Sequence, residues 1–171
     1  MAEQLTHDNT HFTVVKSSKI LVCDGVTSPA NIGGLFRLCD SFGIEKIYFC
    51  GTKIDLSSSR IKRTSRSTHH LINYKDDLDT LAVLKQLTKQ GYRPIALELT
   101  KNSEALEDLD IKDKRPLALF IGNEKTGISS KVLASITTHV HIPMQGNNSS
   151  MNVTQAASIG LYALSLKTKL I

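Results

Sequence analysis

The sequence predicts an α/β domain with a mainly parallel β-sheet flanked by helices. Short apolar runs, each bounded by turn residues, alternate along the chain with segments of helical periodicity. No internal repeat or low-complexity segment interrupts this alternation. A length of 171 residues suits one domain with a sizeable core.

Each element follows from its own local pattern. The apolar runs predict strands, and the run at 116–122 is the most hydrophobic of the chain. Helices are predicted where apolar residues recur every three or four positions between a capping residue and a glycine. The expected strands are 19–26, 46–51, 71–74, 94–99, 116–122 and one that ends at 142. The expected helices are one from a cap at Ser28 or Asn31 to Phe42, then 77–90, then 129–136, and one that begins near Asn152.

The composition is that of a soluble globular protein, with 40% hydrophobic and 22% charged residues. No apolar run approaches the roughly 20 residues that a membrane span needs. The first nineteen residues are polar and lack the apolar centre of a signal peptide. We therefore expect a cytoplasmic protein without a membrane segment, in which 1–19 is an N-terminal extension and 20–171 is the domain. The acidic stretch 104–113 is expected to be exposed.

Cysteines and histidines form no pattern typical of a disulfide framework or a metal site. Cys23, Cys39 and Cys50 are an odd number without C-x-x-C spacing, so we expect core thiols. The pair His69 and His70 has no carboxylate or cysteine at ligand spacing. No metal site is expected.

Positive charge is concentrated in one segment of a chain whose formal net charge is +5. The segment SSSRIKRTSRSTHH is rich in hydroxyls, and no Asp or Glu occurs between Asp55 and Asp76. Arginines and hydroxyls in a flexible segment suit phosphate contacts, whereas a merely solvated face usually includes acidic residues. A nucleic-acid contact is therefore predicted, while 5% aromatic residues and no Trp argue against base stacking. The predicted contact residues are Arg60, Lys62, Arg63 and Arg66.

Three loops rich in Gly, Asn and Ser follow predicted strands, after Val26, Ile121 and Ile142. Ligands of parallel sheets bind at the carboxyl ends of the strands, where these loops should meet. In the third loop, Asn152 with Gln155 three residues later predicts an N-cap with its reciprocal partner. Neither a G-x-G-x-x-G nor a G-x-x-x-x-G-K-[ST] motif is present, which disfavours a Rossmann dehydrogenase or a P-loop enzyme.

Small residues mark two helices that a neighbour approaches closely. Gly33 and Gly34 lie early in the first predicted helix, at a cost of about 1 kcal/mol each relative to Ala. Close approach of RNA or of a partner subunit would explain them. Ala156, Ala157 and Gly160 keep one face of the last helix small, so another backbone can come near it.

Together, the loops resemble the motifs of the SpoU (TrmH-like) branch of the SPOUT RNA methyltransferases. NIGGLFRLCDSFG resembles the family's N-x-G…R motif, with Asn31 and Arg37 in place. FIGNEKTGI resembles its G-x-E-x-x-G motif through Gly122, Glu124 and Gly127. IPMQGNNSSMNVTQAASI resembles the closing motif, and the three positions where the family has Ser-Leu-Asn are Ser150, Met151 and Asn152.

This resemblance implies S-adenosylmethionine as cofactor, methylation of a ribose 2′-hydroxyl in RNA, a homodimer and a C-terminal trefoil knot. The implied catalytic residues are Asn31, Arg37, Glu124, Ser150 and Asn152. The implied cofactor contacts, made mainly through backbone, are Leu99, Gly122, Ile142 and Met151. The family often has a Ser-x-Gly-Ala stretch after the basic segment, but this chain has Arg66 to His70 there, so substrate contacts cannot be transferred.

The expected activity is 2′-O-methylation of a structured RNA, with tRNA favoured and rRNA as an alternative. Arg37 cannot act as a free base, because a guanidinium stays protonated. It is assigned to orienting the ribose hydroxyl and a phosphate, and the family places it near the cofactor of the other subunit. Either phosphate or water accepts the proton. A catalytically silent RNA-binding relative and a small-molecule methyltransferase are the competing functions. The complete motif set disfavours the silent relative, and the basic segment disfavours the small-molecule enzyme.

Overall fold

The computed structural model describes residues 17–169, together with 4, 5, 9, 10 and 15. Its strands are β1 (Ser17–Asp24), β2 (Ile44–Cys50), β3 (Asn73–Leu78), β4 (Arg93–Leu97), β5 (Glu104–Ala105), β6 (Leu117–Gly122) and β7 (Thr138–His141). Its helices are α1 (Pro29–Ser41), α2 (Ser59–Ser65), α3 (Thr80–Lys89), α4 (Ser130–Leu133) and α5 (Val153–Lys169), with a 3-10 turn η2 (Thr68–His70). The extension predicted at 1–19 lies mostly outside the described residues, and its boundary stays a prediction.

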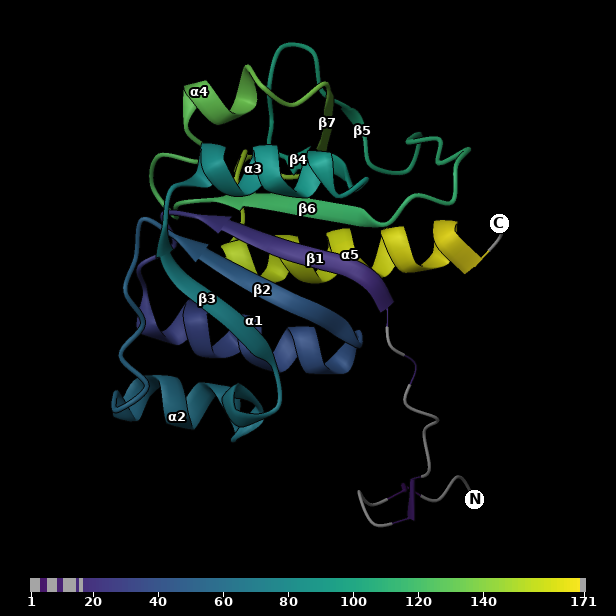
Figure 1. Ribbon diagram of the computed structural model, residues 1–171. Coiled ribbons are helices and arrows are strands. Elements are labelled where there is room, and N and C mark those ends of the chain that lie inside the picture. Colours follow the sequence, from purple (N-terminus) through teal and green to yellow (C-terminus); the bar gives the residue numbers. More distant parts are fainter. Residues whose placement is uncertain (1–3, 6–8, 11–14, 16, 170–171) are drawn as a thin grey trace.

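The strands form one sheet in the order β3-β2-β1-β6-β4-β7-β5. Every hydrogen-bonded pair in it is parallel. Helices α1, α2 and α5 cover one face, and α3 and α4 cover the other (Figure 1). The predicted α/β class with a mainly parallel sheet is therefore confirmed, whereas the trefoil knot stays a prediction.

The core lies on both faces of the central strands. All six residues of β6 are buried, as expected for a parallel strand with helices on both sides. On the α1 face, the ring of Phe36 lies 5.3 Å from those of Phe49 and Tyr74. Full burial of Phe36 and of Phe49 contributes about 1.5–3 kcal/mol each. In the described part of the chain, no helix is long and apolar enough to cross a membrane.

The edge strand β3 differs from its prediction. A strand was expected at 71–74, but β3 continues to Leu78 through three charged residues. These residues suit an edge strand, because β3 pairs with β2 on one side only and its other side has no neighbouring strand. The carboxylate of Asp76 accepts a hydrogen bond from the backbone N–H of Ile54 at 2.7 Å, which holds the loop before α2. A tertiary contact of this kind overrides the weak strand propensity of Asp.

Two further predictions, one boundary and one exposed stretch, were wrong in part. The helix expected at 77–90 begins at Thr80, because the Asp79 side chain caps it by accepting from the N–H of Ala82 at 2.7 Å. The acidic stretch expected to be wholly exposed contributes the short strand β5, which pairs with β7. Leu106 and Leu109, which follow β5, are buried in the core.

Close packing within the chain explains the glycines. A Cβ at Gly33 would overlap with Thr64 and the Ile61 carbonyl of α2, and one at Gly34 would lie 3.0 Å from Thr154 of α5. The expectation that RNA or a partner subunit approaches these glycines is therefore wrong. A Cβ at Gly160 would lie 2.9 Å from Leu97, so the small face of α5 does allow close packing, here against the sheet.

Candidate functional site

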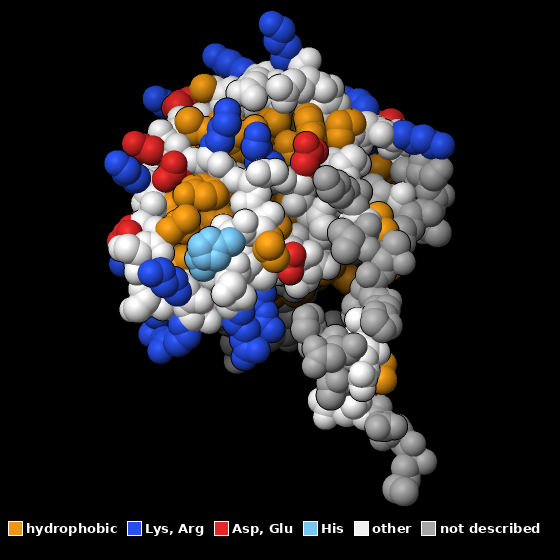
Figure 2. Space-filling view, turned by 60° about the horizontal axis from the view of Figure 1, so that its bottom comes forward, with side chains coloured by type: hydrophobic (Ala, Val, Ile, Leu, Met, Phe, Trp, Pro, Cys, Tyr) orange, Lys and Arg blue, Asp and Glu red, His pale blue; other side chains and the backbone are white. Residues whose placement is uncertain are grey.

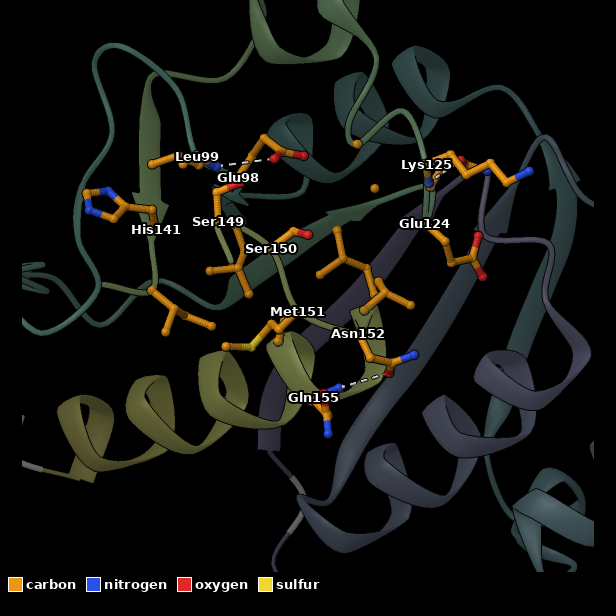
Figure 3. A pocket seen from close by; sticks show the side chains of 18 of the residues that line it. Glu98, Leu99, Glu124, Lys125, His141, Ser149, Ser150, Met151, Asn152 and Gln155 are labelled. Atoms are coloured by element: carbon orange, nitrogen blue, oxygen red, sulfur yellow. Dashed lines mark hydrogen bonds between the residues drawn. The ribbon is translucent and has the colours of Figure 1, made fainter. Parts of the chain in front are cut away.

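The loops that follow β1, β4, β6 and β7 meet at the carboxyl edge of the sheet, as a parallel sheet requires. The loops after β4, β6 and β7 line a cavity of about 850 Å³, which lies within the usual range for small-molecule sites. Figure 3 shows Glu98, Leu99 and His141 on one side of this cavity and Glu124 with Lys125 on the other. Ser150 and Met151 lie between them (Figure 3).

The loop 122–128 forms one wall as a tight hairpin. The backbone groups of Asn123 and Gly127 exchange two hydrogen bonds of 3.0 Å, and Gly127 has a φ of +68°, in the left-handed region that favours glycine. A Cβ at Gly122 would overlap with the backbone of Gly127 and Ile128. The Asn123 amide donates to the carbonyl of Gly25 at 2.6 Å. The two glycines of the G-x-E-x-x-G motif thus allow the hairpin to close, and the Asn123 bond holds the hairpin against the loop after β1.

A hydrogen-bond chain connects one residue from each of the three motifs. Asn31 donates through Nδ2 to Glu124 Oε1 at 2.8 Å, and its Oδ1 accepts from Asn152 Nδ2 at 3.0 Å. Asn152 Oδ1 in turn accepts from the backbone N–H groups of Thr154 at 2.9 Å and Gln155 at 3.4 Å. A carboxylate only accepts and a backbone N–H only donates, so the two ends of the chain fix both amide orientations.

Glu124 also binds the start of α1. Its carboxylate accepts from the backbone N–H of Ser28 at 3.1 Å and of Thr27 at 3.5 Å. Burial raises the pKa of this carboxyl, but the hydrogen bonds from Asn31 and the backbone outweigh that effect, so its pKa lies below the ordinary value. Glu124 is therefore a weak base that stays ionised and holds Asn31 and the α1 terminus in place.

The four residues expected to contact a cofactor all line the large cavity, as do three of those expected to be catalytic. The first group is Leu99, Gly122, Ile142 and Met151, and the second is Glu124, Ser150 and Asn152. Asn31 lines a second cavity of about 480 Å³, whose lining also includes Thr27 and Ser28. The two cavities share Asn123, Glu124, Lys125 and Asn152, so the hydrogen-bond chain stands at their boundary.

Comparison with known proteins supports the motif assignments at this site. The profile of the SpoU rRNA methylase family matches residues 18–162. The chain belongs to this family.

Relatives of this SpoU chain act on both major classes of stable RNA. RlmP of Bacillus subtilis, a 23S rRNA (guanosine(2553)-2′-O)-methyltransferase, is 25% identical over 147 residues, which are 85% of this chain and 57% of that protein. The tRNA (guanosine(18)-2′-O)-methyltransferase of Escherichia coli K12 is 29% identical over 150 residues, which are 84% of this chain and 61% of that protein. This chain therefore spans only part of the length of either relative.

A solved structure confirms the SpoU fold. The crystal structure of an AdoMet-bound rRNA methyltransferase from Sinorhizobium meliloti matches with a TM-score of 0.79 at 23% identity. The match covers 89% of this chain and 57% of that one.

Arg37, the remaining SpoU motif residue, lies apart from the others. It is exposed on α1 and lines neither cavity. Its carbonyl accepts from the Ser41 hydroxyl at 3.0 Å, an ordinary contact within a helix. One copy of the chain thus brings together Asn31, Glu124, Ser150 and Asn152 without Arg37.

The basic segment of this SpoU chain is a helix, and the expectation of a flexible loop was wrong. Ser58 caps α2 by accepting from the Ile61 N–H at 3.5 Å, and Ile61 and Ser65 are buried against α1. The four cations Arg60, Lys62, Arg63 and Arg66 are all exposed. Lys and Arg side chains gather around the lower part of the face shown in Figure 2. The predicted basic surface therefore exists, on a helix fixed to α1.

Glu98 is a site residue that the sequence did not suggest. It follows β4, and its carboxylate accepts from the N–H of Ile128 at 2.9 Å and of Leu99 at 3.2 Å. A Cβ at Gly127 would overlap with this carboxylate. The apolar run around it was read as strand to residue 99, which concealed a polar residue at the strand end. The sequence did contain one signal for Glu98: a polar residue at the carboxyl end of a parallel strand lies where ligands bind.

Replacing Asn152 is expected to lower stability, because this residue caps α5. Asn152→Ala removes the acceptor for Thr154 and Gln155 and should cost about 1 kcal/mol, measured by denaturant unfolding. Asn31→Ala is the comparison variant, since it removes the other half of the Asn–Asn contact, together with the bond to Glu124, and leaves the cap intact. A stability close to that of the parent in Asn152→Ala would show that the cap contributes little.

Proposed function

We propose that this protein transfers a methyl group from S-adenosylmethionine to a ribose 2′-hydroxyl of RNA, with tRNA as the first candidate. The observation that carries the proposal is the hydrogen-bond chain from Glu124 through Asn31 to Asn152 at the boundary of two cavities. One cavity is large enough for a cofactor, and the other is lined wholly by polar residues. The relatives' activities on rRNA and tRNA ribose support the reaction type.

The large cavity fits the cofactor in its chemistry as well as its size. Its wall includes apolar side chains, among them Leu97, Ile121 and Ala156. Polar groups of the hairpin 122–128 and of Ser150 complete the lining. The cofactor supplies a methyl group on a sulfonium centre. The chain must therefore supply position, exclusion of water and a path for one proton.

The amides of the hydrogen-bond chain are suited to hold the acceptor hydroxyl. Each NH₂ group carries two hydrogens, and the bonds described above use one each in Asn31 and Asn152. The second N–H of each amide can donate to a substrate oxygen at the cavity boundary. Glu124, with its lowered pKa, positions Asn31 and does not take the proton. A substrate phosphate or a water molecule accepts it.

The position of Arg37 supports a composite site in a homodimer. Because Arg37 is exposed and lines neither cavity of its own chain, we assign it to the site of a second copy. The apolar side chains Ile159, Tyr162 and Leu166 lie three and four residues apart on α5 and are 41%, 57% and 46% exposed. Such an exposed stripe on an otherwise packed helix suits an interface.

The dimer is expected to be required for activity. Sedimentation of the parent protein should give a dimer at assay concentration, and Tyr162→Glu should shift it to a monomer and remove methyl transfer, because a charge would be buried in the interface. Lys131→Glu, on the opposite face of the sheet, is the control and should leave the dimer intact. An active parent monomer would contradict this prediction.

Binding of RNA is expected to depend on α2. Replacing its four cations, Arg60, Lys62, Arg63 and Arg66, with Ala should weaken binding and flatten the dependence of log affinity on log salt, because fewer counterions are released. The loss of up to four phosphate contacts corresponds to a slope change of about 3–4. Replacing Lys85 and Lys89 of α3 provides the control on the opposite face. An unchanged slope in the α2 variant would remove this helix from the RNA interface.

Methyl transfer from labelled cofactor into total tRNA and rRNA, followed by nuclease mapping, tests the function itself. A labelled 2′-O-methylnucleotide in tRNA supports the proposal, and one in rRNA corrects the substrate. Binding of RNA without labelling would indicate a silent relative, and labelling of small molecules alone would indicate a different class of methyltransferase.

The three described cysteines are free and buried, which suits the reducing cytoplasm that we propose as the compartment.

A further inference from the structure

Two adjacent histidine rings in η2, just after α2, have no part in the proposed methyl transfer. The ring centroids of His69 and His70 are 4.0 Å apart, with 41° between the ring planes. His69 is only 5% exposed, whereas His70 is exposed. The inner ring therefore belongs to the core, and the outer ring belongs to the surface.

The inner ring is fixed by its surroundings. His69 Nδ1 lies 2.6 Å from the hydroxyl of the fully buried Ser65. Its ring lies edge-on to that of Phe36, with centroids 6.4 Å apart. Burial lowers the pKa of His69, and nearby His70 and Lys62 lower it further, so a neutral ring is favoured. The His70 ring thus lies against a ring that cannot move freely.

An uncommon backbone conformation produces this arrangement. Arg66 and Ser67 are consecutive non-glycine residues with φ of 47° and 71°, in the left-handed region. They end α2 and turn the chain into η2, which sends His69 inward and leaves His70 outside. Residues with side chains adopt this region at a cost, and such positions cluster at functional sites.

The exposed ring lies next to the positive charge of α2. Arg66 is four residues before His70, and the segment between Asp55 and Asp76 contains no acidic residue. Leu71, the next residue, is 70% exposed. A flat ring, an apolar side chain and several cations therefore share one surface.

We propose that His70 is a stacking site for an unpaired nucleobase of the RNA whose phosphates contact α2. RNA-binding proteins stack splayed-out bases of loops and bulges on aromatic rings, histidine included, and bind the adjoining phosphates through cations. The low content of Phe, Tyr and Trp argued against stacking, but that count did not include histidine. This inference rests on the proposed function in RNA modification.

The site also has a rigid connection to the catalytic helix. Helix α2 packs on α1 at Gly33, where a Cβ would overlap with Thr64 and the carbonyl of Ile61. Phe36, which the inner ring contacts, lies on α1 as well. A base held on His70 would thus have a fixed position relative to Asn31 at the start of α1. The stack selects RNAs with an unpaired nucleotide at that position.

Fluorescence of 2-aminopurine in RNA hairpins tests the proposal. A set of hairpins, each with 2-aminopurine at one loop position, is titrated with the parent protein, and quenching at one position is expected. His70→Ala should abolish this quenching and weaken binding of that hairpin about 5- to 150-fold, the usual range for loss of one stacked base. His70→Phe should retain both the quenching and the affinity, because it keeps a flat ring.

Two controls separate stacking from charge and from folding. Arg63→Ala should lower affinity and the salt slope but leave the quenching at saturation unchanged. A fully paired RNA duplex should bind the parent and His70→Ala equally. Retained quenching and affinity in His70→Ala, their loss in His70→Phe, or no quenching at any loop position of the parent would overturn the inference. Absence of methyl transfer despite quenching would instead count against the proposed function alone.

Discussion

Arg37→Ala is expected to lower the rate of methyl transfer on the order of a hundredfold or more while leaving cofactor affinity nearly unchanged. Loss of one well-placed charged group commonly costs a few kcal/mol of barrier. The guanidinium lines neither cavity of its own chain, so ground-state cofactor binding should not depend on it. Single-turnover kinetics beside calorimetric cofactor titration measures both quantities. A variant that methylates RNA at close to the parent rate would remove Arg37 from the catalytic residues.

Mixing two inactive variants tests whether Arg37 acts across the dimer. In a heterodimer of Arg37→Ala with Asn31→Ala, one site combines the intact Asn31 of the first chain with the intact Arg37 of the second. Activity should therefore return on mixing. Refolding the two variants together and assaying methyl transfer provides the measurement. No recovery from a mixture shown to contain heterodimers would place Arg37 in the site of its own chain.

Local sequence patterns predicted the elements that hydrophobic periodicity and helix capping determine. The apolar run at 116–122 became the wholly buried β6, and Asn152 caps α5 as its position before an amphipathic segment predicted. The boundary of β3 was wrong because a distant contact decided it. The Asp76 carboxylate binds the Ile54 N–H, twenty-two residues away along the chain, and no local pattern encodes that bond.

The same distinction holds for the site. Motif spacing identified Glu124, Asn31 and Asn152, but their mutual contacts span 93 and 121 residues and appear only in the folded chain. Glu98 lay outside the motifs, in a run read as strand. The basic segment was read as flexible because its hydroxyls and charges concealed Ile61 and Ser65, the two positions that bury α2 against α1.

Gly122→Ala is expected to weaken cofactor binding about 5- to 150-fold. The added Cβ would overlap with the backbone of Gly127 and Ile128, and backbone in a closed hairpin cannot move aside as a flexible side chain can. Overpacking of this kind costs about 1–3 kcal/mol, which here acts on the loop that forms one wall of the large cavity. Calorimetric titration with cofactor measures the loss.

Gly146→Ala is the matched control, because a Cβ there would meet no atom within 4 Å. Gly146 lies in the loop that leads to Ser150 on the same cavity, so a general sensitivity of this region to an added methyl group would affect both variants. We expect the control to bind cofactor within a few-fold of the parent and to unfold at the same denaturant concentration. Thermal unfolding of Gly122→Ala separates a local change from global unfolding, since a folded variant that binds more weakly places the defect in the hairpin. Parent-like binding by a folded Gly122→Ala would mean that the hairpin opens at little cost and that its closed form is not what holds the cofactor.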